Sequence, residues 1–183
     1  MRDAVRKPED ERIELLEGVI VTMSPQGTKH SPVIQRLTHL LVMALGTRAA
    51  VRIQSPFAAS DGSEPEPDVA IGPEADYDDE HPSTALLIIE VAERSLAKDR
   101  GVKAEMYARN GATEYWVANA VDNIIEVHTD ILNGSYTRVR PYTKGESIDL
   151  QSFAEVSLQV KRTARKTVVL RVRAHCRWRS CEH

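Results

Sequence analysis

The sequence contains no apolar run long enough to cross a membrane. None of its 183 residues belongs to a stretch that approaches the roughly 18 consecutive apolar residues of a spanning helix. The N-terminus, MRDAVRKPEDER, is charged where a secretory signal peptide would be apolar. No repeat or low-complexity segment is present. These absences argue against a membrane partner and predict a soluble, cytoplasmic protein.

Cysteine is almost absent. The two cysteines, Cys176 and Cys181, lie close to the C-terminus and outside any patterned segment, so they cannot cross-link a core. Together with His175 and His183 they could in principle bind zinc, but their spacing lacks the paired loops of a zinc knuckle. We expect idle, reduced thiols. A chain of this length can bury one core without disulfides or a structural metal, so one domain is expected.

The net charge of −3 conceals an uneven distribution. Residues 161–183 hold eight of the 24 basic residues but only one of the 27 acidic residues, Glu182. This C-terminal segment is therefore about +7, and the remainder, with 16 basic and 26 acidic residues, is about −10. We expect a domain over residues 12–160 followed by a basic extension, divergent or disordered, whose charge could attract a polyanion. The acidic part is not an obvious nucleic-acid binder.

Two segments have helical periodicity. Apolar residues recur at three- and four-residue spacing over 33–45, and Thr28 or Ser31 is the expected N-cap. A second helix is predicted over residues 95–110, with Ser95 as its N-cap.

The other apolar runs are short and bounded by turn residues, which is typical of β-strands. They predict an opening hairpin over residues 13–23, strands within 50–59, 67–71, 85–91, 114–118, near 123–128 and 135–142, and a turn with a short strand up to residue 160. The resulting order predicts an α/β fold: a central mixed β-sheet flanked by helices, with an N-terminal β-hairpin and a β-rich C-terminal part.

Two carboxylates occupy strand positions where a charge is costly. Glu90 follows five apolar residues, and Asp68 precedes Val69 at the start of another apolar run. An unpaired buried charge would cost several kcal/mol, so each acid needs a partner. Carboxylate oxygens on adjacent strands suit Mg²⁺ or Mn²⁺ better than Zn²⁺. The alternative is that Asp68 caps a turn and Glu90 pairs with a nearby arginine.

The second helix contributes a candidate cation. At 100° per residue, Lys103 and Asp99 fall within the apolar stripe, whereas Lys98 points the opposite way with the solvated Glu105 and Arg109. Lys103 is therefore expected to face the sheet and Glu90. The alternative is an Asp99–Lys103 salt bridge, although such a pair normally lies on the exposed face.

These motifs resemble a known family. Pro67-Asp68, then Glu90-Val91 at a strand end, then a lysine is similar to the PD-(D/E)XK nuclease superfamily. More specifically, the chain resembles the Uma-type restriction endonuclease family over about residues 12–160. The segments that carry this likeness are IELLEGVIVTMSP, EPDVAI, LIIEVAERSLAKDRGVKAEMYA and GATEYWVANAVDN.

The resemblance implies roles for individual residues, and a restriction-endonuclease-like core. Asp68 and Glu90 would be metal ligands, and the Val91 carbonyl would be a third. Lys103 would be the catalytic lysine, relocated to a helix because Ala92 stands at the superfamily's usual lysine position.

Two further positions match the family pattern. Glu14 occupies the acidic position of the opening hairpin and would complete the metal shell, and His30 would lie near the phosphate. A later family glutamate is replaced by Val19, which puts the role of the hairpin in doubt. Tyr115 and Trp116 could stack on bases, but in a strand that follows a helix they are expected in the core.

The expected function is Mg²⁺- or Mn²⁺-dependent hydrolysis of DNA phosphodiester bonds. A homodimer would allow cutting of both strands. One alternative is a catalytically inactive domain of the same fold that binds DNA or a protein partner. Another is a metal-assisted phosphodiesterase acting on RNA or a nucleotide. The acidic body weighs against DNA, because phosphate binding requires a positive groove.

Overall fold

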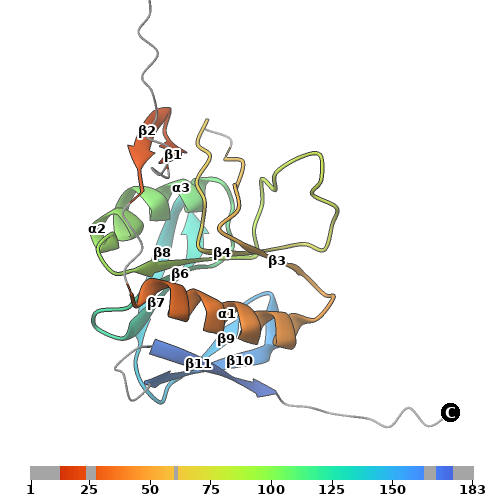
Figure 1. Cartoon of the computed structure of the whole chain (residues 1–183), viewed down its shortest axis with the longest axis vertical. Helices are drawn as coiled ribbons and strands as arrows, with labels where there is room; N and C mark the ends of the chain where they lie inside the picture. Colours follow the sequence, from red (N-terminus) through yellow and green to blue (C-terminus); the bar gives the residue numbers. More distant parts are fainter. Residues whose placement is uncertain (1–12, 24–27, 60–61, 163–167, 175–183) are drawn as a thin grey trace, which may run out of the picture.

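The computed structural model describes residues 13–23, 28–59, 62–162 and 168–174. Its centre is a six-stranded sheet with the strand order β3-β4-β5-β6-β7-β8 (Figure 1). The strands of this sheet are β3 (Ala50–Ile53), β4 (Val69–Gly72), β5 (Leu87–Ala92), β6 (Tyr115–Asn119), β7 (Ile124–Leu132) and β8 (Ser135–Tyr142).

The sheet is mixed. Strand β5 is parallel to β6, whereas all other neighbouring pairs are antiparallel. Strands β4 and β5 are continuously buried, as their apolar sequences predict for strands covered on both faces. The predicted α/β fold with a central mixed sheet flanked by helices is confirmed. No helix among the described residues is both long enough and apolar enough to span a bilayer.

Helix α1 (His30–Leu45) covers one face of the sheet. Its buried side chains follow the predicted three- and four-residue spacing, and the chain turns out of the helix at Gly46, where φ is 57°. The N-cap prediction is wrong, because the helix begins before Ser31 and Lys29 occupies the cap position without a side-chain hydrogen bond. The first turn is held instead by the side chain of His30, which contacts Asp68.

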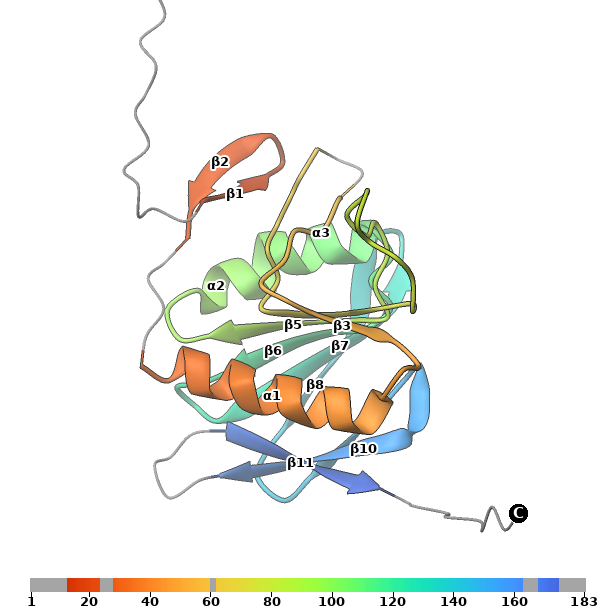
Figure 2. The same ribbon diagram turned by 45° about the vertical axis from the view of Figure 1, so that its right-hand side comes forward.

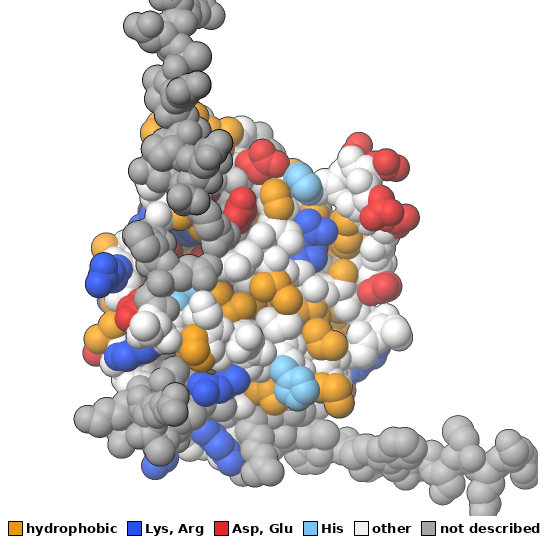
Figure 3. All heavy atoms as spheres, viewed as in Figure 1, with side chains coloured by type: hydrophobic (Ala, Val, Ile, Leu, Met, Phe, Trp, Pro, Cys, Tyr) orange, Lys and Arg blue, Asp and Glu red, His pale blue; other side chains and the backbone are white. Residues whose placement is uncertain are grey.

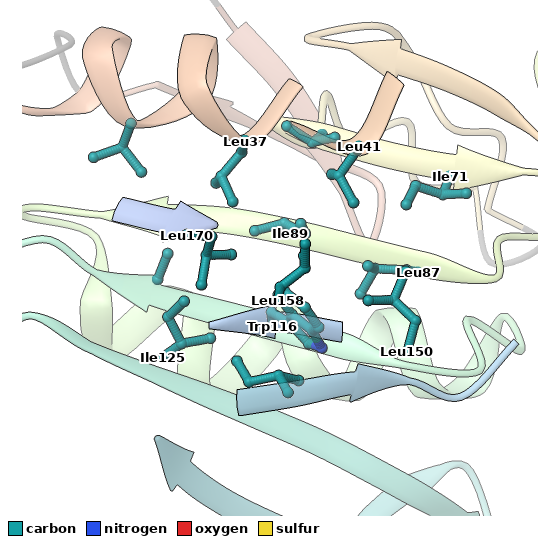
Figure 4. Close-up of a cluster of buried hydrophobic side chains, with 14 of the residues drawn as sticks. Leu37, Leu41, Ile71, Leu87, Ile89, Trp116, Ile125, Leu150, Leu158 and Leu170 are labelled. Atoms are coloured by element: carbon teal, nitrogen blue, oxygen red, sulfur yellow. The ribbon is translucent and has the colours of Figure 1, made fainter. Parts of the chain in front are cut away.

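A second, three-stranded sheet packs with α1 against the same face. It consists of β9 (Ser147–Leu150), β10 (Phe153–Arg162) and β11 (Val168–Ala174) in the order β11-β10-β9. Figure 4 shows Leu37 and Leu41 of α1 and Leu158 and Leu170 of this sheet converging on Ile89 and Trp116. This face of the central sheet is an extended apolar core.

Strand β11 lies within the segment predicted from the sequence to be a basic extension. Residues 168–174 form seven residue pairs with β10, and Leu170 is buried in the core. Residues 168–174 are therefore an ordered strand, since their apolar run completes a sheet, and the division of the chain at residue 160 stays a prediction. The rest of the expected basic extension, apart from residues 161–162, lies outside the described residues, as do Cys176 and Cys181.

The opposite face is covered by a broken helix. Instead of one helix over 95–110, the chain forms α2 (Leu96–Lys98), a π-helical segment η1 (Asp99–Lys103) and α3 (Ala104–Arg109). The break falls at Gly101, whose φ and ψ are −102° and −106°. Ser95 holds the N-cap position, but its side chain is not a cap, because its hydroxyl donates to the Asp99 carboxylate at 2.5 Å.

The predicted N-terminal hairpin forms a sheet of its own. Strands β1 (Ile13–Leu16) and β2 (Val19–Thr22) pair around the Glu17-Gly18 turn and stand above the end of the central sheet near α2 (Figure 2). Leu16 is buried with the residues under α3, whereas Val19 is 61% exposed. The hairpin is thus fastened to the domain by β1.

Candidate active site

Asp68 and Glu90 are brought together by the pairing of β4 with β5. Val69 pairs with Ile89 in antiparallel register, so Asp68, one residue before β4, lies beside Glu90. The backbone N–H of Val91 donates to Asp68 Oδ2 at 2.8 Å. Both acids are buried, with residue exposures of 5%. The predicted juxtaposition of two buried carboxylates on neighbouring strands is present.

Glu90 is held by two donors from the covering helix. Lys103 Nζ donates to Glu90 Oε1 at 2.9 Å, and the Tyr107 hydroxyl donates to the same oxygen at 2.8 Å. Burial raises the pKa of Glu90 to about 8; Lys103 opposes this rise and Asp68 adds to it. The alternative in which Glu90 pairs with an arginine is wrong, because its cationic partner is Lys103.

Asp68 is held by the first turn of α1. His30 Nε2 lies 2.9 Å from Asp68 Oδ2, and His30 Nδ1 is buried without a hydrogen-bond partner in the described structure. Burial lowers the pKa of His30, but the Asp68 carboxylate more than offsets this and the net pKa is raised. His30 is therefore bonded to one of the two central acids rather than idle at the surface.

Glu14 of the hairpin lies between two lysines. Lys98 Nζ donates to Glu14 Oε1 at 2.6 Å, and Lys103 Nζ lies 2.9 Å from Glu14 Oε2. The second contact is an ion pair without hydrogen-bond geometry, since Glu14 Oε2 has no hydrogen-bond partner. Burial raises the pKa of Glu14, but the two ammonium groups outweigh burial and the net pKa is lowered. In this arrangement Glu14 contacts cations.

The placement of Lys98 corrects the helix-wheel prediction. Lys98 does not share the solvated face with Glu105 and Arg109, both of which are exposed, but turns toward Glu14. The kink at Gly101 changes the angular spacing between Lys98 and Lys103, which an uninterrupted α-helix would separate by about 140°. A wheel drawn at 100° per residue cannot represent such a kink.

Lys103 is almost completely enclosed. Its side chain is 3% exposed and contacts both Glu14 and Glu90. Burial lowers its pKa, but these carboxylates outweigh burial, so the net pKa is raised and the side chain is an ammonium ion at neutral pH. The prediction that Lys103 faces Glu90 is confirmed. The alternative was an ion pair between Asp99 and Lys103. Lys103 instead pairs with Glu14 and Glu90, and the Asp99 carboxylate accepts from Ser95.

Two residues of this cluster were missed by sequence reasoning. Tyr107 lies one helical turn after Lys103 in the same apolar stripe, so its sequence position indicated a core residue. In the structure its hydroxyl contacts Glu90. Asp99 was identified only as a salt-bridge partner; it binds Ser95, and its backbone carbonyl accepts a hydrogen bond from Tyr115. The signal that could have found Tyr107 is its four-residue spacing from Lys103. Tyr115 and Trp116 are fully buried, as predicted for core residues.

The site has donors that suit a hard divalent cation. Within the described residues no group of three or more His, Cys, Asp or Glu side chains is arranged around a metal position. His30 and the Val91 N–H contact Asp68 Oδ2, and Lys103 and Tyr107 donate to Glu90 Oε1. Mg²⁺ commonly uses one or two carboxylates plus water and phosphate oxygens. The two acids therefore fit such an ion.

Comparison with known proteins identifies the family and the fold of the chain. A family model, Uma2, described as "Putative restriction endonuclease", matches residues 3–161. The fold is similar to that of a crystal structure from Anabaena variabilis described as "a putative nuclease belonging to DUF820", with a TM-score of 0.61 and 15% identity over 78% of this chain and 83% of that chain. No curated protein sequence matches.

Proposed function

The chain belongs to the Uma2 family of restriction endonuclease-like proteins, and we propose that it is a metal-dependent endonuclease that hydrolyses DNA phosphodiester bonds. The observation that carries the proposal is the contact of Lys103 with Glu90, one strand away from Asp68, in a buried cluster. A lysine beside two carboxylates at the end of neighbouring strands is a suitable arrangement for phosphodiester hydrolysis.

Asp68 and Glu90 would hold a Mg²⁺ or Mn²⁺ ion, with the Val91 carbonyl as a further ligand. When bound, the ion would lower the pKa of a water and neutralise charge on the phosphate. His30 and the Val91 N–H would fix the Asp68 carboxylate, and Tyr107 would fix that of Glu90. These contacts orient both acids before substrate arrives.

Lys103 would act through its charge. Because its pKa is raised, it carries a proton at neutral pH and cannot readily accept another from water. Its ammonium would stabilise the negative charge that develops on the phosphate oxygens in the transition state. Glu14 would keep this ammonium in place by pairing with it from the hairpin side. Glu14 is therefore assigned to positioning Lys103 rather than to the metal shell.

Cleavage of plasmid DNA with Mg²⁺ or Mn²⁺ tests the proposal. Asp68→Asn, Glu90→Gln and Lys103→Met should each lower the cleavage rate by about 10²-fold or more, because each removes a group that binds the ion or balances transition-state charge. Glu105→Gln is the matched control, since Glu105 is exposed on α3. Equal cleavage by wild type and all three variants would refute the assignment.

One observation favours a second function. Because no group of three or more metal-ligating side chains occurs within the described residues, the domain could bind DNA or a protein without cutting it. Titration calorimetry separates the two functions: metal-dependent DNA binding without any cleavage would support the inactive domain. A parallel assay with RNA and with nucleotides would identify another phosphodiesterase.

Two active centres would allow both strands of a duplex to be cut during one encounter. We therefore propose that the protein acts as a homodimer on DNA. Light scattering of the wild-type protein with and without a short duplex tests this, and one protein molecule per duplex during double-strand cleavage would refute it.

A further inference from the structure

Lys98 is the most accessible cation of the site, and the proposed chemistry does not use it. Its side chain is 26% exposed, compared with 3% for Lys103, although both ammonium groups contact Glu14. The Lys98 ammonium is therefore tied to the buried cluster, while part of its side chain is exposed to solvent. A cation in this position can contact a ligand without breaking the pair between Lys103 and Glu90.

The local backbone explains how both lysines reach one carboxylate. Within η1 (Asp99–Lys103) the chain departs from helical geometry at Gly101, so two short helical segments meet there at a kink. The kink changes the direction in which the side chains on either side of it point, whereas a continuous α-helix would separate residues five positions apart by about 140°. The two ammonium groups thus occupy the two oxygens of Glu14.

The charge around the site indicates what Lys98 would bind. The loop between β4 and β5 is strongly acidic and would repel a polyanion; its exposed acids are Glu74, Asp76, Asp78, Asp79 and Glu80. Figure 3 shows acidic side chains gathered at the upper right, whereas Lys and Arg side chains lie toward the left, where Figure 1 places α2, and toward the bottom, where it places β9–β11. A phosphate chain would therefore approach from the α2 side.

We infer that Lys98 binds a backbone phosphate of the nucleic acid next to the phosphate that is cleaved. This inference rests on the proposed function and adds a substrate-binding residue to it. Glu14 holds both cations, so the buried Lys103 serves the reaction and the partly exposed Lys98 serves binding. The competing explanation is that Lys98 only neutralises the buried charge of Glu14.

Substitution of Lys98 separates these explanations. DNA affinity is measured by fluorescence anisotropy on a short duplex, with Ca²⁺ replacing Mg²⁺, at several salt concentrations. Lys98→Met should weaken binding by roughly fivefold and reduce the slope of log affinity against log salt by about 1, because one phosphate contact is lost. In cleavage assays its KM should rise more than its kcat falls. Lys98→Arg should retain the slope, and Lys144→Met is the control on an exposed lysine of the β8–β9 turn.

The same substitution made in a Glu14→Gln variant tests the competing explanation. In Glu14→Gln protein, Lys98 has no carboxylate to neutralise, so a purely structural Lys98 predicts no further effect of Lys98→Met. The inference predicts the same loss of affinity and slope as in the wild-type background. Thermal melts establish that each variant is folded. If Glu14→Gln does not fold, the test is the salt slope of Lys98→Met in the wild-type background, which falls by about 1 when a phosphate contact is lost.

The outcomes distinguish this inference from the proposed function. Unchanged affinity and salt slope in Lys98→Met, with wild type that binds and cleaves DNA, would overturn the role of Lys98 alone. Binding without cleavage by the wild type, together with the loss in Lys98→Met, would overturn the endonuclease activity and support the phosphate contact. A wild type that neither binds nor cleaves DNA would overturn both.

Discussion

The two faces of the central sheet are built from the same strands but differ in chemistry. The face under α1 is an apolar core that continues into β9–β11, and its buried carboxylate Glu114 is bonded to Trp116 Nε1 and to the Gln151 backbone. The face under α3 has a smaller apolar cluster and carries the charged groups of the site. Alternation along β5 makes this possible, because Ile89 and Val91 face α1 while Glu90 faces α3.

This division shows how stability and function are separated in one sheet. Burial of large apolar side chains contributes about 1.5–3 kcal/mol each, which compensates for the desolvation of the carboxylates on the other side. Substitutions on the α1 face should therefore change the free energy of unfolding, whereas substitutions on the α3 face should chiefly change activity.

The largest effect is expected on the α1 face. Leu170→Ala should lower the free energy of unfolding by about 2–4 kcal/mol, because it leaves a cavity where β11 packs on the core. Urea unfolding measures this, and Val139→Ala is the control because Val139 is 51% exposed on β8. A loss no larger than that of the control would show that β11 does not contribute to the core.

An intermediate effect is expected from the charge of Glu90. Its pKa is about 8 in the folded protein and near 4.5 when unfolded, so the unfolded chain loses this proton at lower pH. The raised pKa of Glu90 therefore contributes fully to the free energy of unfolding below about pH 4.5, and this contribution is lost as the pH rises through 8. From pH 5 to 8.5, the stability of wild type relative to Glu90→Gln should therefore fall by about 1–3 kcal/mol.

Urea unfolding of both proteins at several pH values measures this difference. Glu105→Gln, on the exposed side of α3, should give a difference from wild type that does not vary with pH. If the difference in free energy of unfolding between wild type and Glu90→Gln is also independent of pH, the pKa of Glu90 is not raised.

The smallest effect is expected from the hydroxyl of Tyr107, on the α3 face of the sheet. Tyr107→Phe removes a donor to Glu90 and should lower the cleavage rate about three- to tenfold, at a stability cost of about 1 kcal/mol. Tyr136→Phe is the matched control, because its hydroxyl donates to the Ala112 carbonyl away from the carboxylates. Tyr136→Phe should lower the free energy of unfolding by a similar amount and leave the cleavage rate unchanged. Equal cleavage by the two variants would argue against a role for Tyr107 in orienting Glu90.

Much of the fold and the centre of the site followed from the sequence. Binary pattern located the hairpin, α1 and the strands of the central sheet, and the burial cost of isolated charges identified Asp68 and Glu90 within apolar runs. Lys103 was predicted from the apolar stripe of its helix, and its contact with Glu90 is present. These features depend on local periodicity and on desolvation, both of which can be read along a single chain.

The tertiary structure decided what these groups contact. The kink at Gly101 interrupts the helix between Lys98 and Lys103, so that Lys98 contacts Glu14, and the pairing of β11 with β10 makes residues 168–174 part of a sheet. The hydrogen bond from His30 to Asp68 joins residues separated by 38 positions. Helix irregularity, strand partnership and long-range contacts depend on the energy of the whole packed domain, so local sequence pattern does not determine them. The sequence by itself thus determined which residues form the cluster's centre, and only the packed structure decided their partners.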